Sequence, residues 1–148
     1  MTEKILRCTI VSSTNGSVMK ELLGNQFFKD NIYSVISDRN CLAIDRAGQH
    51  GIQTHIFCEN DKEIFCARLL DYLIAHKIDY LISFYTKLFV GDLLNVYKDR
   101  IINLHPTLLP SIVSCQSTII AAALANCVTS RAQLLVARLF LCQVSQHV

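Results

Sequence analysis

An amide and an imidazole two residues apart, Asn103 and His105, have the side chains best suited to chemistry. They end an apolar run, and in a β-strand residues i and i+2 point to the same face. Pro106 then ends the strand and holds His105 extended. Because an amide N–H stabilises an oxyanion and an imidazole moves protons near neutral pH, the pair suits acyl transfer through a tetrahedral intermediate. On spacing alone, the simpler interpretation is favoured, in which both side chains only satisfy hydrogen bonds of a loop.

A second candidate site is the polar loop over residues 12–17, which could hold an anion. It joins a predicted strand to a helix N-terminus, where unpaired N–H groups favour negative charge. Gly16 allows close approach of the backbone, and Ser17 adds a hydroxyl. The loop therefore predicts a phosphate cradle, although Asn-Gly-Ser is also ordinary turn chemistry. The three spaced glycines of a dinucleotide fingerprint are absent, which counts against a nicotinamide dehydrogenase.

Alternating strands and helices position both candidates. Strands are expected over residues 5–11, 32–37, 52–57, 80–84 and 101–105, and helices over 41–50, from 18 and from about 60. Strands separated by helices of this length predict an α/β fold with a parallel Rossmann-like sheet and helices on both faces. Ligands of such sheets bind at the carboxyl ends of the strands, where the loop and the Asn–His pair fall.

Local signals define two of these helices. Gly51 stands where a left-handed C-cap belongs. Asn60 is the expected N-cap of the following helix, with Glu63 three residues later. The apolar positions of that helix fall on one stripe formed by Ile64, Ala67, Leu70 and Ile74.

Residues 103–110, Asn-Leu-His-Pro-Thr-Leu-Leu-Pro, resemble the signature of formyltransferases that use 10-formyltetrahydrofolate. Residues 13–17 are similar to the first loop of the glycinamide-ribonucleotide group, and residues 35–38 and 46–52 resemble its second strand, helix and turn. The resemblance covers roughly residues 5–126. It implies formyl transfer from 10-formyltetrahydrofolate to the amine of glycinamide ribonucleotide in purine biosynthesis. Methionyl-tRNA formyltransferase and the formyl-folate hydrolase fit less well, and a weaker alternative is an unrelated Rossmann-like binder.

The resemblance also implies roles for individual residues. Asn103 would polarise the formyl oxygen, and His105 would serve proton transfer. The substrate phosphate would be bound by Asn15, Gly16, Ser17 and Val18. The folate would be bound by Lys62, Thr86, Lys87, Leu88, Phe89 and Asn103. No metal is implied.

Three positions depart from the family pattern. Val18 stands where the family usually has Asn, which weakens the prediction of one phosphate contact. Lys87 stands where the family has Arg, so the charge is kept without the bidentate fork. Lys62 replaces a family Arg, and for this residue a solvated surface charge is the favoured interpretation.

The composition changes at Arg100. The last 49 residues contain three Arg, no acid and no glycine. The Asp-x-Gly loop whose Asp orients the family's His therefore has no counterpart in them. The sequence predicts a formyltransferase-like α/β domain over residues 1–126, incomplete or degenerate at its C-terminus, and an unrecognised tail over 127–148. It leaves open an impaired transferase, a non-catalytic remnant, or a nucleotide- or folate-binding module.

The overall composition is that of a globular domain, with 51% hydrophobic and 18% charged residues. A net charge of +2 without a Lys/Arg cluster gives no indication of nucleic-acid binding. Seven cysteines without a Cys-x-x-Cys pair, and no signal-like N-terminus, favour reduced thiols over metal ligation. We therefore expect a cytoplasmic protein, a monomer or weak homo-oligomer, with small-molecule substrates and no membrane partner.

Overall fold

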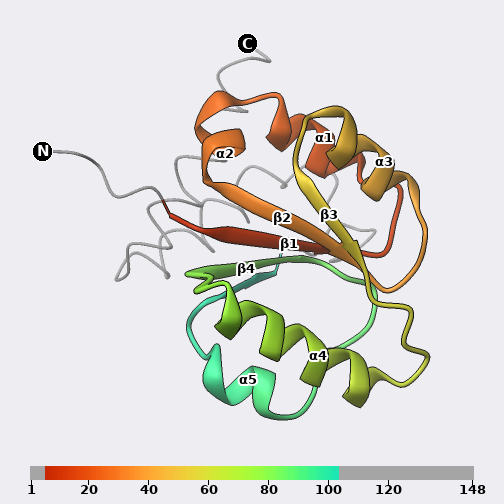
Figure 1. Cartoon of the computed structure of the whole chain (residues 1–148), viewed down its shortest axis with the longest axis vertical. Helices are drawn as coiled ribbons and strands as arrows, with labels where there is room; N and C mark the ends of the chain where they lie inside the picture. Colours follow the sequence, from red (N-terminus) through yellow and green to blue (C-terminus); the bar gives the residue numbers. More distant parts are fainter. Residues whose placement is uncertain (1–5, 104–148) are drawn as a thin grey trace, which may run out of the picture. The chain divides into compact units, whose positions relative to one another are not determined.

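The computed structural model describes residues 6–103, which form a five-stranded parallel sheet with the order β3-β2-β1-β4-β5. The strands are β1 (Cys8–Ser12), β2 (Ile32–Ser37), β3 (Gln53–Ile56), β4 (Tyr80–Phe84) and β5 (Ile101–Asn103). Helices α1 (Ser17–Leu23), α2 (Gln26–Asn31) and α3 (Leu42–Gln49) cover one face, and α4 (Lys62–Ala75) and α5 (Asp92–Val96) cover the other (Figure 1). The predicted α/β fold class is confirmed.

The central strand β1 is buried along its whole length, with Ile10 and Val11 fully inaccessible. It pairs in parallel with β2 on one side and β4 on the other. A strand covered by helices on both faces has no solvated side, which is why even its polar residues, Thr9 and Ser12, are buried. β3, at the edge of the sheet, is exposed at both of its end residues, Gln53 and Ile56.

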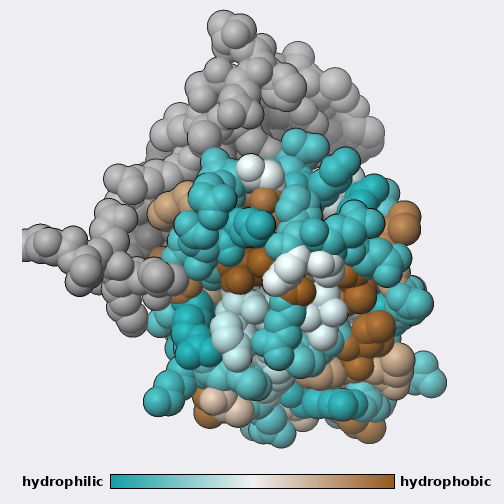
Figure 2. All heavy atoms as spheres, turned by 45° about the horizontal axis from the view of Figure 1, so that its top comes forward, coloured by the Kyte–Doolittle hydropathy of each residue, from teal (hydrophilic) through white to brown (hydrophobic). Residues whose placement is uncertain are grey.

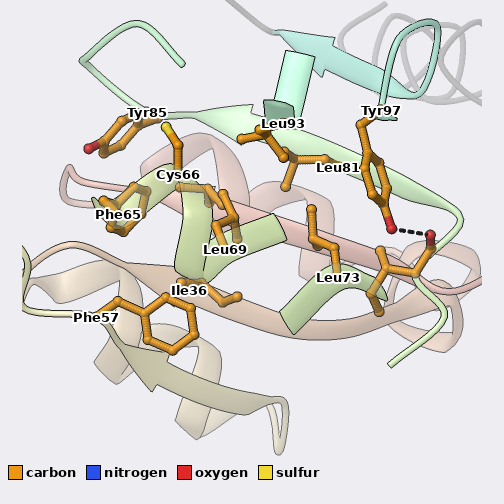
Figure 3. Close-up of a cluster of buried hydrophobic side chains, with 12 residues drawn as sticks. Ile36, Phe57, Phe65, Cys66, Leu69, Leu73, Leu81, Tyr85, Leu93 and Tyr97 are labelled. Carbon is orange, nitrogen blue, oxygen red and sulfur yellow. Dashed lines mark hydrogen bonds between the residues drawn. The ribbon is translucent and has the colours of Figure 1, made fainter. Parts of the chain in front are cut away.

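Helix α4 packs on the sheet through Phe65, Cys66, Leu69 and Leu73, all buried against residues such as Val11 and Leu81 (Figure 3). The predicted stripe did not identify this face. Its end members, Ile64 and Ile74, are 56% and 54% exposed. Because α4 is apolar on more than one side, periodicity allows two stripes, and the bulkier Phe and Leu side chains fill the space above the sheet.

Helix α5 completes the core on this side. Leu93 and Tyr97 are buried, and the Tyr97 hydroxyl donates a hydrogen bond of 2.9 Å to the Ile78 carbonyl (Figure 3). A buried phenol normally finds such a partner. This contact links the end of α5 to the turn that precedes β4.

Two helix ends test the capping predictions. Gly51 has a φ of 73°, as expected for a left-handed residue just after α3. The N-cap of α4 is Asp61, and the prediction of Asn60 was wrong. The Asp61 carboxylate accepts hydrogen bonds from the N–H groups of Glu63 and Ile64, at 2.7 and 3.1 Å. A carboxylate suits this position better than an amide because it also complements the helix dipole.

Two short helices, α2 and α5, were not predicted. α2 begins after Asn25, whose side chain accepts a hydrogen bond from the Phe27 N–H.

On the face shown in Figure 2, the described surface is largely hydrophilic, with separate apolar patches. No helix within residues 6–103 is long and apolar enough to cross a membrane.

Candidate functional site

The sheet reverses its order of strands beside β1. The chain runs from β1 outward to β2 and β3, and then returns to place β4 and β5 on the other side of β1. The loop after β1 leads to α1 on one face, whereas the loop after β4 leads to α5 on the other (Figure 1). In open α/β sheets, ligands bind at the carboxyl ends of the strands at such a reversal point.

The two loops at this point contact each other. We call residues 13–16 the first loop and Thr86, Lys87, Leu88 and Phe89 the 86–89 segment. Ser13 Oγ lies 2.9 Å from Thr86 Oγ1 and accepts a hydrogen bond of 3.1 Å from the Thr86 N–H. The structure therefore brings together two groups of candidate residues that lie about 70 positions apart in the sequence.

Gly16 has a steric and a conformational role in the first loop. Its φ is 68°, and a Cβ there would lie 2.8 Å from Ala43 Cβ and 2.9 Å from Ala43 Cα. The loop can therefore pass this close to α3 only with glycine. Arg46 of α3 donates a hydrogen bond of 2.8 Å to the Asn15 carbonyl. These contacts fix the loop against α3.

The remaining phosphate candidates are solvent-exposed next to Gly16. The Asn15 side chain accepts a hydrogen bond from the Ser17 N–H at 3.2 Å, which orders the turn into α1. Val18, the second residue of α1, is 42% exposed. Asn15, Ser17 and Val18 are thus accessible from the same turn.

Within the 86–89 segment, one residue is built into an aromatic stack and its neighbour is free. The ring of Phe89 stacks on Tyr85 with centroids 5.3 Å apart, and Tyr85 stacks in turn on Phe65 of α4 at 5.0 Å. Burial of Tyr85, with the nearby Asp38 charge, raises its pKa to about 12. Leu88 is 83% exposed. The stack fixes the end of the segment, and Leu88 projects from it.

An ion cluster lies beside this segment and was not predicted as part of the site. Asp38 follows β2, and its side chain is only 3% exposed. Its carboxylate accepts hydrogen bonds from Arg39 Nε and Nη2, at 3.0 and 2.8 Å, and from Lys87 Nζ at 3.0 Å. Burial would raise the pKa of Asp38, but the two cations outweigh burial and hold it below its usual value.

Two further candidates, Lys62 and Asn103, belong to elements that meet this edge. Lys62 is the exposed first residue of α4, one turn before Phe65. Asn103 ends the described part of β5 and pairs with Ser83 of β4. His105 lies outside the described residues. Within residues 6–103, no group of three or more His, Cys, Asp or Glu side chains could hold a metal ion.

Comparison with known protein families gives a match over residues 6–131 to the family described as formyl transferase. The chain belongs to the formyl transferase family. No curated protein sequence matches it. The formyl transferase match includes the first loop, the 86–89 segment and the Asn103–Pro110 motif.

Solved structures of formyl transferases share the fold. The phosphoribosylglycinamide formyltransferase of Streptococcus pneumoniae TIGR4 is 29% identical, with a TM-score of 0.61 over 71% of this chain and 59% of that chain. The enzyme of the same name from Brucella melitensis is also 29% identical, with a TM-score of 0.63 over 80% and 68%. A formyltetrahydrofolate deformylase from Burkholderia mallei ATCC 23344 shares the fold at 20% identity and a TM-score of 0.61, over 69% and 38%. The chain thus spans about three fifths of the Streptococcus structure.

Proposed function

We propose that this chain transfers a formyl group from 10-formyltetrahydrofolate to the amine of glycinamide ribonucleotide, a reaction of purine biosynthesis. One observation carries the proposal. The first loop follows β1, the 86–89 segment follows β4, and β5 leads into the Asn103–Pro110 motif. These three strands are adjacent in the sheet. The first loop and the 86–89 segment are also joined by the Ser13–Thr86 hydrogen bonds. These positions support an arrangement in which phosphate, donor and catalytic residues share one edge of the sheet.

Each part of this edge has a role in the proposal. The acceptor phosphate binds to the exposed turn formed by Asn15, Gly16, Ser17 and Val18. The folate lies along the 86–89 segment, with Lys62 near it on the first turn of α4. Both ligands are small molecules, and their reacting groups meet next to the end of β5.

The chemistry follows from the two side chains of the motif. The acceptor amine attacks the formyl carbon of the donor, and the carbonyl oxygen becomes an oxyanion that the Asn103 amide stabilises. His105 takes the proton that the amine loses and delivers it to N10 of the folate as the C–N10 bond breaks. A new amide C–N bond has formed, tetrahydrofolate leaves, and no oxidant or metal is required by this balance.

Release of tetrahydrofolate in the presence of glycinamide ribonucleotide tests the proposal. Asn103→Ala and His105→Ala should each lower the rate about 10²–10³-fold, as expected for loss of one oxyanion donor or proton carrier. Asn60→Ala, which removes an exposed amide that does not cap α4, should leave the rate unchanged. Full turnover in either motif variant would contradict the assigned roles. Formate release without the acceptor would instead indicate transfer to water.

A second candidate function is a binding module without turnover. The observation that favours it is that no Asp or Glu follows Asp99, so residues 100–148 supply no carboxylate to orient His105. Titration calorimetry with tetrahydrofolate and with glycinamide ribonucleotide separates the two. Heat of binding without turnover would support the module, whereas turnover would exclude it.

A further inference from the structure

We propose that Asp38 is a positioning residue for the 86–89 segment. Its carboxylate holds Lys87 and thereby sets the geometry in which the segment meets the formyl donor. This inference rests on the proposed function for the identity of the ligand. The positioning itself depends only on the contacts of Asp38 and can be tested separately.

The ion pair crosses the end of the central strand. Asp38 follows β2 and Lys87 follows β4, and these strands are not neighbours because β1 lies between them. Lys87 Nζ nevertheless lies 3.0 Å from Asp38 Oδ2. The contact therefore ties the loop after β4 to the end of a strand with which β4 does not pair.

Asp38 is well suited to be the fixed partner. Its side chain is 3% exposed, whereas those of Arg39 and Lys87 are 53% and 40% exposed. Arg39 binds both carboxylate oxygens, a geometry that fixes the plane of the carboxylate. The Arg39 N–H also donates to Ser37 Oγ at 3.2 Å, which fixes the backbone of the same turn. One oxygen, Oδ2, is thus presented to Lys87 in a set direction.

The segment is held at both ends, and its free residue lies between them. Ser13 and Asp38 hold Thr86 and Lys87, and the stack on Tyr85 holds Phe89. Leu88, 83% exposed, stands between these anchors. An apolar side chain on a fixed backbone can contact a flat heteroaromatic ring without a large loss of entropy on binding. If Lys87 were released, the segment would lose more conformational entropy on binding, and the affinity for the donor would fall while that for the acceptor would not.

The decisive variant is Asp38→Asn, which keeps the shape of the side chain and removes its charge. We expect tetrahydrofolate to bind roughly 3–10-fold more weakly, since about one ordered side chain and its loop become free. Glycinamide ribonucleotide should bind within twofold of the wild type. In a Lys87→Gln background, Asp38→Asn should have little further effect, because the two residues act through each other.

The matched control is Glu59→Gln, which breaks the 2.8 Å ion pair between Glu59, before α4, and Arg68, in the middle of α4. Donor binding should not change in this variant. Unchanged donor affinity in folded Asp38→Asn protein, or equal weakening for donor and acceptor, would overturn the inference. So would the same loss of affinity in Glu59→Gln.

Amide hydrogen exchange without ligand distinguishes this inference from the proposed function. Asp38→Asn should accelerate exchange at Thr86 and the residues up to Phe89, and leave the core amide of Leu69 unchanged. If wild-type protein bound neither ligand, the proposed function would fail, yet faster exchange would still support the positioning contact. Unchanged exchange across the 86–89 segment would overturn that contact even in a protein that binds its donor.

Discussion

The loops at the carboxyl edge of the sheet and the packed layer under α4 are held together by different forces. The layer under α4 is almost entirely apolar, and Phe65, Leu69 and Leu73 have no exposed surface. The edge is held by single contacts between loops, such as Ser13 with Thr86 and Asp38 with Lys87. Burial of apolar area is summed over many atoms, whereas each of these polar contacts contributes on its own.

The difference separates stability from ligand binding. Changes under α4 should alter the free energy of unfolding without selecting between ligands. Changes at the edge should alter affinity while the sheet persists, as is usual for loops on a rigid scaffold.

The largest effect is expected under α4. Leu69→Ala removes a fully buried side chain and should lower the free energy of unfolding by about 3–5 kcal/mol, through lost transfer energy and a residual cavity. Ile74→Ala on the same helix removes a side chain that is 54% exposed and should cost less than about 1 kcal/mol. Urea denaturation measures both. Equal losses would mean that the assigned buried face of α4 is wrong.

Gly16 is where the edge depends on steric fit. Gly16→Ala should cost about 2–3 kcal/mol, because the left-handed φ is unfavourable for alanine and the new methyl overlaps Ala43. Gly51→Ala has a similar φ of 73° but no atom within 4 Å, so it should cost only about 1–2 kcal/mol. The excess in Gly16→Ala, measured by urea denaturation, isolates the overlap. Similar costs for both variants would indicate that the first loop moves away from α3 easily.

Tyr97→Phe tests whether a single hydrogen bond inside the apolar layer contributes to the free energy of unfolding. The variant removes the hydrogen bond to the Ile78 carbonyl and keeps the ring in place. We expect a loss of about 1 kcal/mol, typical of a buried hydrogen bond whose acceptor becomes unsatisfied. Thermal unfolding at neutral pH would detect it. No loss would mean that water replaces the hydroxyl and that this end of α5 is open.

The smallest effect should come from His55, a titratable group on the α4 side of the sheet. Its ring lies 4.9 Å from that of Tyr72, which lies 4.2 Å from His76. Burial and the neighbouring His76 lower the pKa of His55 below 6.5. The folded state therefore favours the neutral ring. This contribution is complete above pH 6.5 and is lost as the pH falls through the lowered value.

Unfolding free energies measured at pH 8 and at pH 5.5 check this sign. The difference between the two should shrink in His55→Gln, which cannot titrate. If the wild type and His55→Gln lost the same stability on acidification, the dependence would come from other groups.

The sequence predicted the fold well where single residues decide local structure. The strands β2 and β4 were predicted with their observed bounds, and the apolar run of β2 stops at the charged Asp38. The α4 stripe failed because a helix that is apolar on several sides has no single preferred face until the sheet is in place. The predicted N-cap of α4 was one residue too early, because Asn and Asp are both favoured at this position.

The sequence predicted three groups of candidate site residues, and it did not predict the contact between the loops after β1 and β4. Asp38 and Lys87 are 49 positions apart, and the local sequence around either residue does not predict that the other is its partner. Their pairing depends on the strand order, which places β1 between them. The adjacent acid and base at the end of β2, Asp38 and Arg39, were the available signal, since this edge is where ligands bind.

The position of β1 in the middle of the sheet has a consequence for the growing chain on the ribosome. Ser12 is synthesised early, but its partner in the register, Phe84, follows 72 residues later. At about 5–20 residues per second, that interval is roughly 4–14 s. During this time one edge of a strand that is fully buried in the folded protein has no native partner, so its backbone hydrogen-bonding groups remain open to pairing with other extended chains.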